Sequence, residues 1–445
     1  MSLFETCEQA VKLARKAGAA EAEAYAERTR ESSVSVRDGE VEELHQAASK
    51  GVGLRVVSAG RLGFAYGTDF SKDGLKALAE RAVALAKGAA KDEANALPRG
   101  KELGSTGEGD YDPAIADIDP GWKLKAAREA ERGAKDEDPR VRKFDSTSAG
   151  DFLAESAIAS SRGASGTSRA SYVYVHCSPV AEADGQLQTA SWGDTRRRLA
   201  RLEAPEQIGR TAARKAARML GARKPKTQRA AVVLDPRLAA GFIGGLAGAV
   251  SGDLVHKQSS FLRDKLGKRI APETITIVDD ATLGEGIASR PFDGEGVASR
   301  RLPIVERGIL TSFLYDTRTA RRAKAKSTGS ASRGWSSLPS IGTSNFFLER
   351  GKQDPDELVR GVKNGLYVTA MLGRGADVVT GDYSRGANGI WIENGELAFP
   401  VQEITVSGNL LEMLAAIDGV GDDLDFRSSV AAPTIRFAEL QISGA

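Results

Sequence analysis

Histidine is scarce among the residues that could do chemistry in this chain. Only three occur among 445 residues: His45, His176 and His256. A catalytic zinc needs three protein ligands and usually a carboxylate base, often supplied by His and Glu spaced along one helix. None of these histidines begins a His-Glu helix motif, because each is followed by Gln, Cys or Lys. The sequence therefore predicts no catalytic residue and no metal ligand in this chain.

Cysteine and serine chemistry is equally poorly supported. Cys7 falls on the apolar face of an N-terminal helix and is predicted to be a core residue. His176 and Cys177 are neighbours in a predicted strand, so they point to opposite faces and cannot share one metal. No serine in a nucleophile-elbow context accompanies a histidine. Two cysteines without a signal peptide predict a reducing, cytoplasmic location.

Five glycines fall between residues 241 and 252, inside a predicted helix. The run lacks the Gly-Lys-Ser/Thr ending of a P-loop and contains no GxGxxG pattern. Glycine costs a helix about 1 kcal/mol per position relative to alanine, so the run needs a packing explanation. We expect a neighbouring element, of this chain or of another, to lie close against this surface.

A basic cluster at residues 318–326 precedes a stretch rich in serine and glycine at 327–345. Lys and Arg total 62 against 60 for Asp and Glu, and stacking aromatics are missing, so a solvated face is favoured over nucleic-acid binding. About 19 residues without periodicity are typical of a lid or binding loop. We expect this loop to be mobile and to contact a peptide or a partner. The candidate contacts are Arg333, Trp335, Ser344 and Asn345. The alternative for Trp335 is an aromatic that merely anchors its loop.

The elements that must position these residues predict an α+β fold. Helix, antiparallel strands and helix occur in that order twice, predicting an N-terminal α+β domain at 1–115 and a middle α+β domain at 116–225. Asp-Gly at 38–39 predicts a type I′ hairpin turn. Residues 88–120, rich in Pro and Gly, are predicted to form a linker.

The remaining residues, 226–445, predict a larger β-rich domain with a long Gly-rich helix that runs from about 236 to 268. Many short strands linked by Gly-rich turns are typical of a sandwich or barrel. The longest weakly apolar run, at 238–250, is shorter than the roughly 20 residues that a membrane span needs. We therefore expect no membrane partner.

Four segments carry a resemblance that covers essentially the whole chain. They are GVGLR at 51–55, RPFDGEG at 290–296, GDYSRGANG at 381–389 and FPVQEITVSGN at 399–409. With these motifs the chain resembles the TldD/PmbA family, formerly called modulators of DNA gyrase. The family that it resembles has two branches. TldD-like chains carry a His-Glu-x-x-x-His helix and a C-terminal cysteine as zinc ligands, whereas TldE/PmbA-like chains lack them.

Alignment of the family's Gly-Asp on residues 252–253 places the lost zinc motif at Ile243, Gly244 and Gly248. Residues 236–252 contain no His, Glu or Cys, and the segment near the expected thiolate, 422–429, contains no cysteine. The resemblance thus implies the TldE/PmbA branch, and the scarcity of histidine agrees with it independently.

The function that the resemblance implies is a non-catalytic subunit of a heterodimeric zinc metallopeptidase that acts on extended or unfolded peptides. No cofactor is expected in this chain, and zinc is expected in a TldD-like partner. A homodimer is the other assembly that the sequence leaves open. Two other functions also stay open, a stand-alone metallopeptidase with atypical ligands and a regulator of DNA gyrase or DNA topology.

Overall fold

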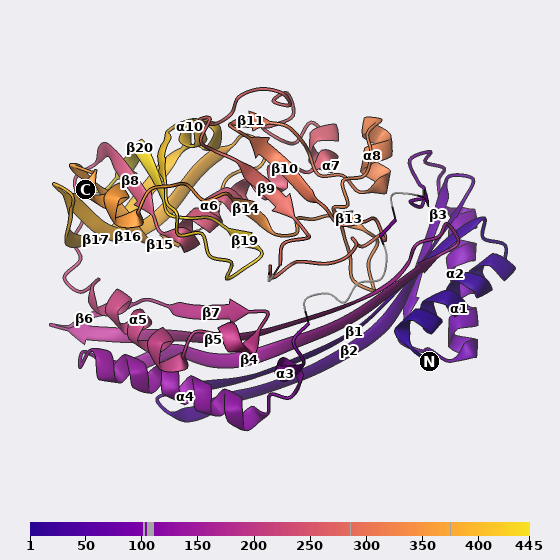
Figure 1. The fold of residues 1–445 in the computed structure, drawn as a ribbon, viewed down its shortest axis with the longest axis horizontal. Helices are drawn as coiled ribbons and strands as arrows, with labels where there is room; N and C mark the ends of the chain where they lie inside the picture. Colours follow the sequence, from indigo (N-terminus) through magenta and orange to yellow (C-terminus); the bar gives the residue numbers. More distant parts are fainter. Residues whose placement is uncertain (101–102, 105–110, 285, 374) are drawn as a thin grey trace.

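The computed structural model describes residues 1–100, 103–104, 111–284, 286–373 and 375–445, so part of the predicted 88–120 linker lies outside the described residues. A long curved sheet forms one side of the molecule, and the C-terminal half lies over its concave face (Figure 1). The α+β class expected from the sequence is confirmed.

Strands from both predicted N-terminal units pair in a single seven-stranded sheet. Its order is β3-β2-β1-β4-β5-β6, with β7 also paired to β5. The pairing of β1 with β4 joins the two units along 14 residues of each strand, from Glu23 opposite Ser160 to Val36 opposite Thr147. The strands are β1 (Glu21–Arg37), β2 (Glu40–Ser58), β3 (Arg61–Gly67), β4 (Val141–Ser160), β5 (Ser165–Ala183), β6 (Gln186–Thr189) and β7 (Trp192–Arg196).

Local turn chemistry sets the hairpins of this sheet. Asp38 and Gly39 both adopt positive φ, at 55° and 86°, as the predicted type I′ turn requires. Ala59 and Gly60 do the same between β2 and β3. Strand β2 extends beyond its buried residues, because the exposed stretch that carries His45 also belongs to the strand.

Helices cover one face of the sheet at both of its ends (Figure 1). Ala22, Ala24 and Ala26 of β1 pack with α1 and α2, whereas Val34 and Val36 of the same strand pack with α4 and α5. Because these residues alternate with Glu23 and Tyr25, the other face of β1 is left to the C-terminal half. The helices are α1 (Leu3–Lys16), α2 (Lys72–Gly88), α3 (Pro113–Ala116), α4 (Pro120–Glu137) and α5 (Pro205–Ala217), and a short 3₁₀ helix spans Leu199–Arg201.

The C-terminal half contains two larger sheets with one shared core. The pairing of β17 with β20 closes β8, β15, β16, β17 and β20 into a ring. Strand β18 pairs with the first residues of β20, and β17 pairs with its last residues. These strands are β8 (Gln228–Leu234), β15 (Asn364–Leu372), β16 (Asp382–Glu393), β17 (Glu396–Asn409), β18 (Ile417–Val420) and β20 (Ile435–Ser443). The second sheet, in the order β11-β10-β9-β14-β19, comprises β9 (Ile277–Asp280), β10 (Arg301–Glu306), β11 (Ile309–Leu310), β14 (Phe346–Leu348) and β19 (Val430–Ala431).

The Gly-rich helix α6 (Pro236–Ala249) lies between the ring and this second sheet. The expected extension to about 268 is wrong. The Gly252 N–H donates to the carbonyl of Leu314 instead of continuing the helix, and Tyr315 packs so closely that a Cβ at Gly252 would overlap its ring. The other helices of this half are α7 (Gly252–His256), α8 (Thr317–Ala323), α9 (Pro355–Arg360) and α10 (Leu410–Ala415).

Close backbone approach does not explain the four glycines of α6. A Cβ at Gly245 would lie 3.7 Å from Ala376 Cβ, which is ordinary contact, and Gly241, Gly244 and Gly248 have similar space. Within this chain, the expected tight packing is confirmed at Gly252 and wrong at the four glycines of α6. It also occurs between α4 and α5, where a Cβ at Gly209 would overlap the Ala130 carbonyl.

These two environments predict opposite effects of the same substitution. Gly209→Ala should destabilise the protein by about 1–3 kcal/mol, because the helix backbones must separate. Gly245→Ala should stabilise it by about 0.5–1 kcal/mol, because alanine loses less conformational entropy than glycine when the helix forms. Urea denaturation of both variants measures the difference. A Gly209→Ala protein as stable as the unsubstituted chain would contradict the packing described here.

Candidate functional site

A chain of buried charges joins the sheet to the C-terminal half. Arg55 of β2 contacts Glu23 of β1 at 2.8 Å and Glu295 at 2.7 Å, and Arg333 contacts the other oxygen of Glu23 at 2.7 Å. The side chains of Glu23 and Arg333 are fully buried. The charges of Glu23 and Glu295 outweigh burial and raise the pKa of Arg55. Two of the motifs that carry the family resemblance, GVGLR and RPFDGEG, therefore meet at this junction.

Trp335 docks on the same sheet beside this charge chain. A Cβ at Gly51 would overlap its indole ring, and one at Gly53 would overlap its carbonyl oxygen. Its ring also meets Tyr66 edge-on, with centroids 5.7 Å apart. The interpretation of Trp335 as the anchor of its loop matches this packing.

The predicted loop at 327–345 contains regular structure that its sequence did not indicate. Strands β12 (Ala331–Ser332) and β13 (Ser340–Ile341) pair within it. Ser344 donates from its backbone N–H and its hydroxyl to Asp279, and the buried amide of Asn345 donates to the Asp280 carbonyl. The expectation of a loop without regular structure is therefore wrong. Contact of Arg333, Trp335, Ser344 and Asn345 with a peptide or a partner stays a prediction, and it would require the three buried side chains among them to move.

Several arginines of the basic cluster at 318–326 form ion pairs and hydrogen bonds within the protein. Arg318 and Arg322, on α8, contact Asp92 at 2.9 and 2.8 Å, and Arg321 donates to the Glu93 carbonyl. The hydrogen bond from Arg318 and that from Ala94 lower the pKa of Asp92. These contacts attach the segment after α2 to the C-terminal half.

The three positions of the lost zinc motif differ in their surroundings. Ile243 is fully buried in the core of the C-terminal half. Gly244 is half-buried, with Val430 Cγ1 3.6 Å from where its Cβ would be, and Gly248 is exposed. None of the three offers a donor atom, so these residues do not fit a zinc ion. Within the described ranges, no three His, Cys, Asp or Glu residues are grouped so as to hold a metal.

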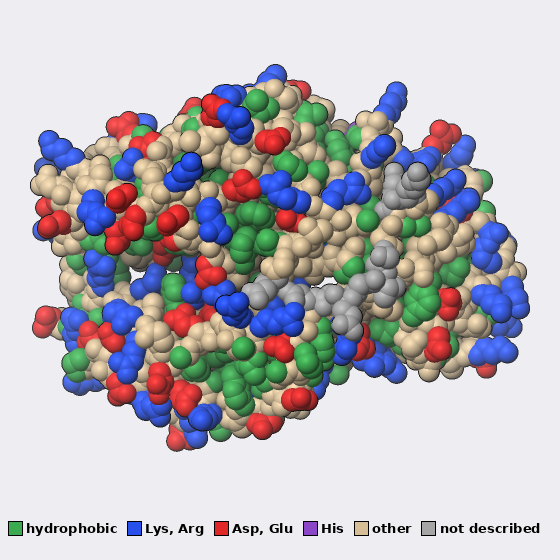
Figure 2. Space-filling view, in the orientation of Figure 1, with side chains coloured by type: hydrophobic (Ala, Val, Ile, Leu, Met, Phe, Trp, Pro, Cys, Tyr) green, Lys and Arg blue, Asp and Glu red, His purple; other side chains and the backbone are tan. Residues whose placement is uncertain are grey.

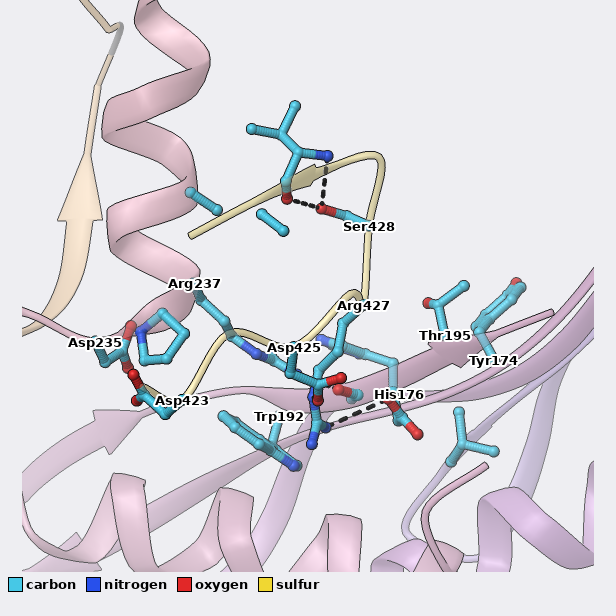
Figure 3. Close-up of a pocket in the computed structure, with 17 residues that line it drawn as sticks. Tyr174, His176, Trp192, Thr195, Asp235, Arg237, Asp423, Asp425, Arg427 and Ser428 are labelled. Atoms are coloured by element: carbon cyan, nitrogen blue, oxygen red, sulfur yellow. Dashed lines mark hydrogen bonds and ion pairs between the residues drawn. The ribbon is translucent and has the colours of Figure 1, made fainter. Parts of the chain in front are cut away.

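A cavity of about 560 Å³ opens at the beginning of this same helix. Its walls come from β5, β7, the first turn of α6 and the segment 423–431 (Figure 3). It faces the hollow between the two halves of the molecule, where charged side chains of both signs gather (Figure 2). Ala240, on the same face of α6 as Gly244, belongs to its lining, so the cavity adjoins the surface of the lost motif.

His176 and Trp192 form the floor of the cavity. His176 points away from the helix-covered face, which holds the buried Cys177, as their adjacency in β5 predicts. Burial lowers the pKa of His176, and the charge of Arg237 lowers it further, so the imidazole is neutral at pH 7. Burial raises the pKa of Cys177 and of Cys7 to about 12, which leaves both thiols protonated.

Most of this cavity has no counterpart in the sequence motifs. The segment 422–429 lacks the cysteine that a TldD-like chain would carry, but its Asp425 and Arg427 form ion pairs in the wall of the cavity. Arg237 follows the Asp235-Pro236 start of α6 and had no local pattern to mark it. The useful signal was the density of charged residues at 194–198 and 422–427, which no single motif captures.

Comparisons with known proteins agree with this architecture. Residues 22–86 match the PmbA/TldA metallopeptidase domain 1, residues 113–220 the central domain, and residues 227–444 the C-terminal domain. The chain is 33% identical to Metalloprotease PmbA of Escherichia coli O157:H7 over 425 residues, 95% of this chain and 92% of that protein. The chain therefore belongs to the PmbA/TldD metallopeptidase family.

Solved structures share the fold over nearly the whole chain. A putative modulator of DNA gyrase from Bacteroides thetaiotaomicron superimposes with a TM-score of 0.90 at 26% identity, covering 99% of this chain and 98% of that one. TldE from Thermococcus kodakarensis has the same fold, with a TM-score of 0.91 at 22% identity over 98% of this chain and 99% of its own. Among the residues that the structure describes, no helix is both long and apolar enough to cross a bilayer.

Arg55 should be the most sensitive residue of the junction. Arg55→Met would leave Glu23 and Glu295 buried with one cation fewer, and we expect a loss of about 3–5 kcal/mol in the free energy of unfolding. The control is Arg229→Met, which removes an exposed ion pair with Glu439 and should cost at most about 1 kcal/mol. Equal small losses in denaturant titrations of the two variants would contradict a stabilising role for the junction.

The buried carboxyl of Asp279 should make the free energy of unfolding depend on pH. Burial raises its pKa to about 6, against the hydrogen bonds from Ser344 and the charge of Arg290. The folded state thus binds the proton more tightly than the unfolded state, so this carboxyl destabilises the fold increasingly from pH 4 to above pH 6. Relative to Asp279→Asn, the unsubstituted chain should lose roughly 2–3 kcal/mol over that range. A pH-independent difference between the two unfolding curves would contradict it.

Proposed function

We propose that this chain is the TldE/PmbA-type, non-catalytic subunit of a heterodimeric zinc metallopeptidase that acts on extended or unfolded peptides. The observation that carries the proposal is the side-chain chemistry of α6. Where the family's zinc motif aligns, the helix offers Ile243, Gly244 and Gly248, which have no donor atoms. The zinc and the nucleophilic water would belong to a TldD-like partner, and no catalytic step is assigned to this chain.

The proposed contribution of this chain is to shape the chamber and hold the peptide. The sheet supports this with an open edge, because β3 pairs only with Val52–Ser58 of β2. Backbone groups of Glu40–Gly51 face outward on that edge, and no described strand pairs with them there. An extended peptide could add to such an edge by main-chain hydrogen bonds, which tolerate many sequences.

The experiment compares the isolated chain with a mixture. The purified chain should contain far less than one zinc per molecule by elemental analysis and should not cleave an unfolded peptide, because water without a metal keeps a pKa near 15.7. Addition of a TldD-like chain should give cleavage that a chelator abolishes. Substitution of the partner's His-Glu-x-x-x-His histidines should abolish it as well.

Two outcomes would overturn this proposal in different directions. Stoichiometric zinc with peptidase activity in the homogeneous isolated chain would favour a stand-alone metallopeptidase with atypical ligands. Salt-dependent binding of DNA, with no association with a TldD-like chain, would favour a regulator of DNA topology. We propose a cytoplasmic location for the assembly, which fractionation of cells would test.

A further inference from the structure

The cavity at the start of α6 contains one cation that lacks a carboxylate partner. Four carboxylates line its wall, from Asp194, Asp235, Asp423 and Asp425, together with the guanidinium groups of Arg237 and Arg427. Which of these charges are already paired decides what kind of ligand the cavity can accept.

Asp194 and Asp425 are paired with two neighbouring arginines. Arg196 contacts Asp425 through both terminal nitrogens, at 2.7 and 2.8 Å, and contacts Asp194 at 2.9 Å. Arg427 contacts Asp425 at 2.7 Å and Asp194 at 3.3 Å. Burial tends to raise the pKa of Asp425, but the hydrogen bond and charge of Arg196, followed by those of Arg427, hold it below the ordinary value. Arg427 also contacts Glu203 at 2.9 Å, so both arginines are committed to carboxylates of the chain and neither is free for a ligand.

Asp235 and Asp423 are committed to holding the backbone. Asp235 caps α6 by accepting from the Leu238 N–H at 3.0 Å and pairs with Lys215 at 3.0 Å. Asp423 accepts from the backbone N–H and the hydroxyl of Thr434, at 2.8 and 2.7 Å. Asp235 is thus paired with a cation, whereas Asp423 keeps its charge but makes no ion pair with Arg237 among the described residues.

Arg237 is held in place by contacts that do not neutralise it. Its guanidinium stacks 3.8 Å from the centroid of Trp192 and donates one hydrogen bond to the Gly193 carbonyl. Within the described part of the chain, no carboxylate lies within ion-pair distance of it. Burial lowers the pKa of Arg237 and the charge of Arg427 lowers it further, against the more distant charges of Asp235, Asp194 and Glu203. An arginine stays protonated at neutral pH.

We propose that this cavity binds a carboxylate of a peptide, with Arg237 as the residue that pairs with it. The inference rests on the proposed peptide-handling function and names the group on the peptide that this chain would select. A guanidinium has five N–H donors, of which the Gly193 carbonyl takes one, so a carboxylate can be held by two others. The neutral imidazole of His176 and the apolar side chains of Pro236, Ala240 and Val430 suit the remainder of a peptide.

The carboxylates around the cavity favour a singly charged ligand over a phosphate. The nearby carboxylates of Asp194, Asp425 and Glu203 would repel a dianionic phosphate more strongly than a singly charged carboxylate. The carboxylate can come from the C-terminus of the peptide or from an acidic side chain. The experiment therefore includes both sources.

The test measures binding to the full chain by calorimetry, without any peptidase activity. The probes are acetyl-Ala-Ala-Leu with a free carboxylate, the same peptide as its C-terminal amide, acetyl-Ala-Glu-Leu-amide, and inorganic phosphate. We expect at least one carboxylate peptide to bind roughly tenfold or more tightly than the uncharged amide, which corresponds to a charge-assisted hydrogen-bonded pair. The stronger of the two identifies the C-terminus or the side chain as the source.

Substitutions assign the preference to Arg237. Arg237→Gln should abolish the difference between acid and amide, and Arg237→Lys should restore part of it because the charge returns without the two-pronged geometry. The control is Arg223→Gln, since Arg223 stacks on Phe399 at 3.6 Å outside the cavity and should leave the preference unchanged.

Equal affinity of the unsubstituted chain for acid and amide peptides would overturn the inference, whether or not the variants fold. Tighter binding of phosphate than of either carboxylate peptide would also overturn it, as would a preference that survives in folded Arg237→Gln. Association with a TldD-like chain is measured separately by gel filtration. Normal association with no carboxylate preference would refute the carboxylate site and leave the proposed function standing.

Discussion

The buried charge chain Arg333–Glu23–Arg55–Glu295 is the constraint on which the arrangement of this molecule depends. It takes one residue from each of two sheet strands and two from the C-terminal half, and its members are up to 310 positions apart in the sequence. Charges removed from water are expensive unless they are paired. These buried ion pairs therefore favour one relative placement of the sheet and the C-terminal half. They also fix the position of the β12–β13 loop.

Local features of the fold were predictable because their causes are local. The Asp38–Gly39 turn and the apolar faces of α1 and α2 follow from neighbouring residues. Continuation of the sheet from β1 to β4 was not predictable, since it depends on pairing between residues more than 100 positions apart. The end of α6 was missed for the same reason, because the carbonyl that captures the Gly252 N–H belongs to Leu314.

The candidate site shows the same division between local and distant causes. The lack of donors at Ile243, Gly244 and Gly248 could be seen in the sequence, because it needs only residue types. The cavity could not, since the stacking of Arg237 on Trp192 and the pairing of Arg196 with Asp425 join segments that are 45 and 229 positions apart. Burial of Arg333 was hidden as well, because its loop carries no periodic pattern that would place it against β1.

Helix α6 connects the two functional conclusions. Its middle carries the positions that offer no zinc donor, and its first turn carries Arg237 in the cavity beside them. In the proposed assembly, this surface has exchanged bond-breaking chemistry for peptide recognition. The most direct test of that central claim is native mass spectrometry of this chain co-purified with a TldD-like chain. We expect a complex of one copy of each chain with one zinc. When the two subunits are separated, the zinc should stay with the TldD-like subunit. Zinc retained by this chain after separation would contradict it.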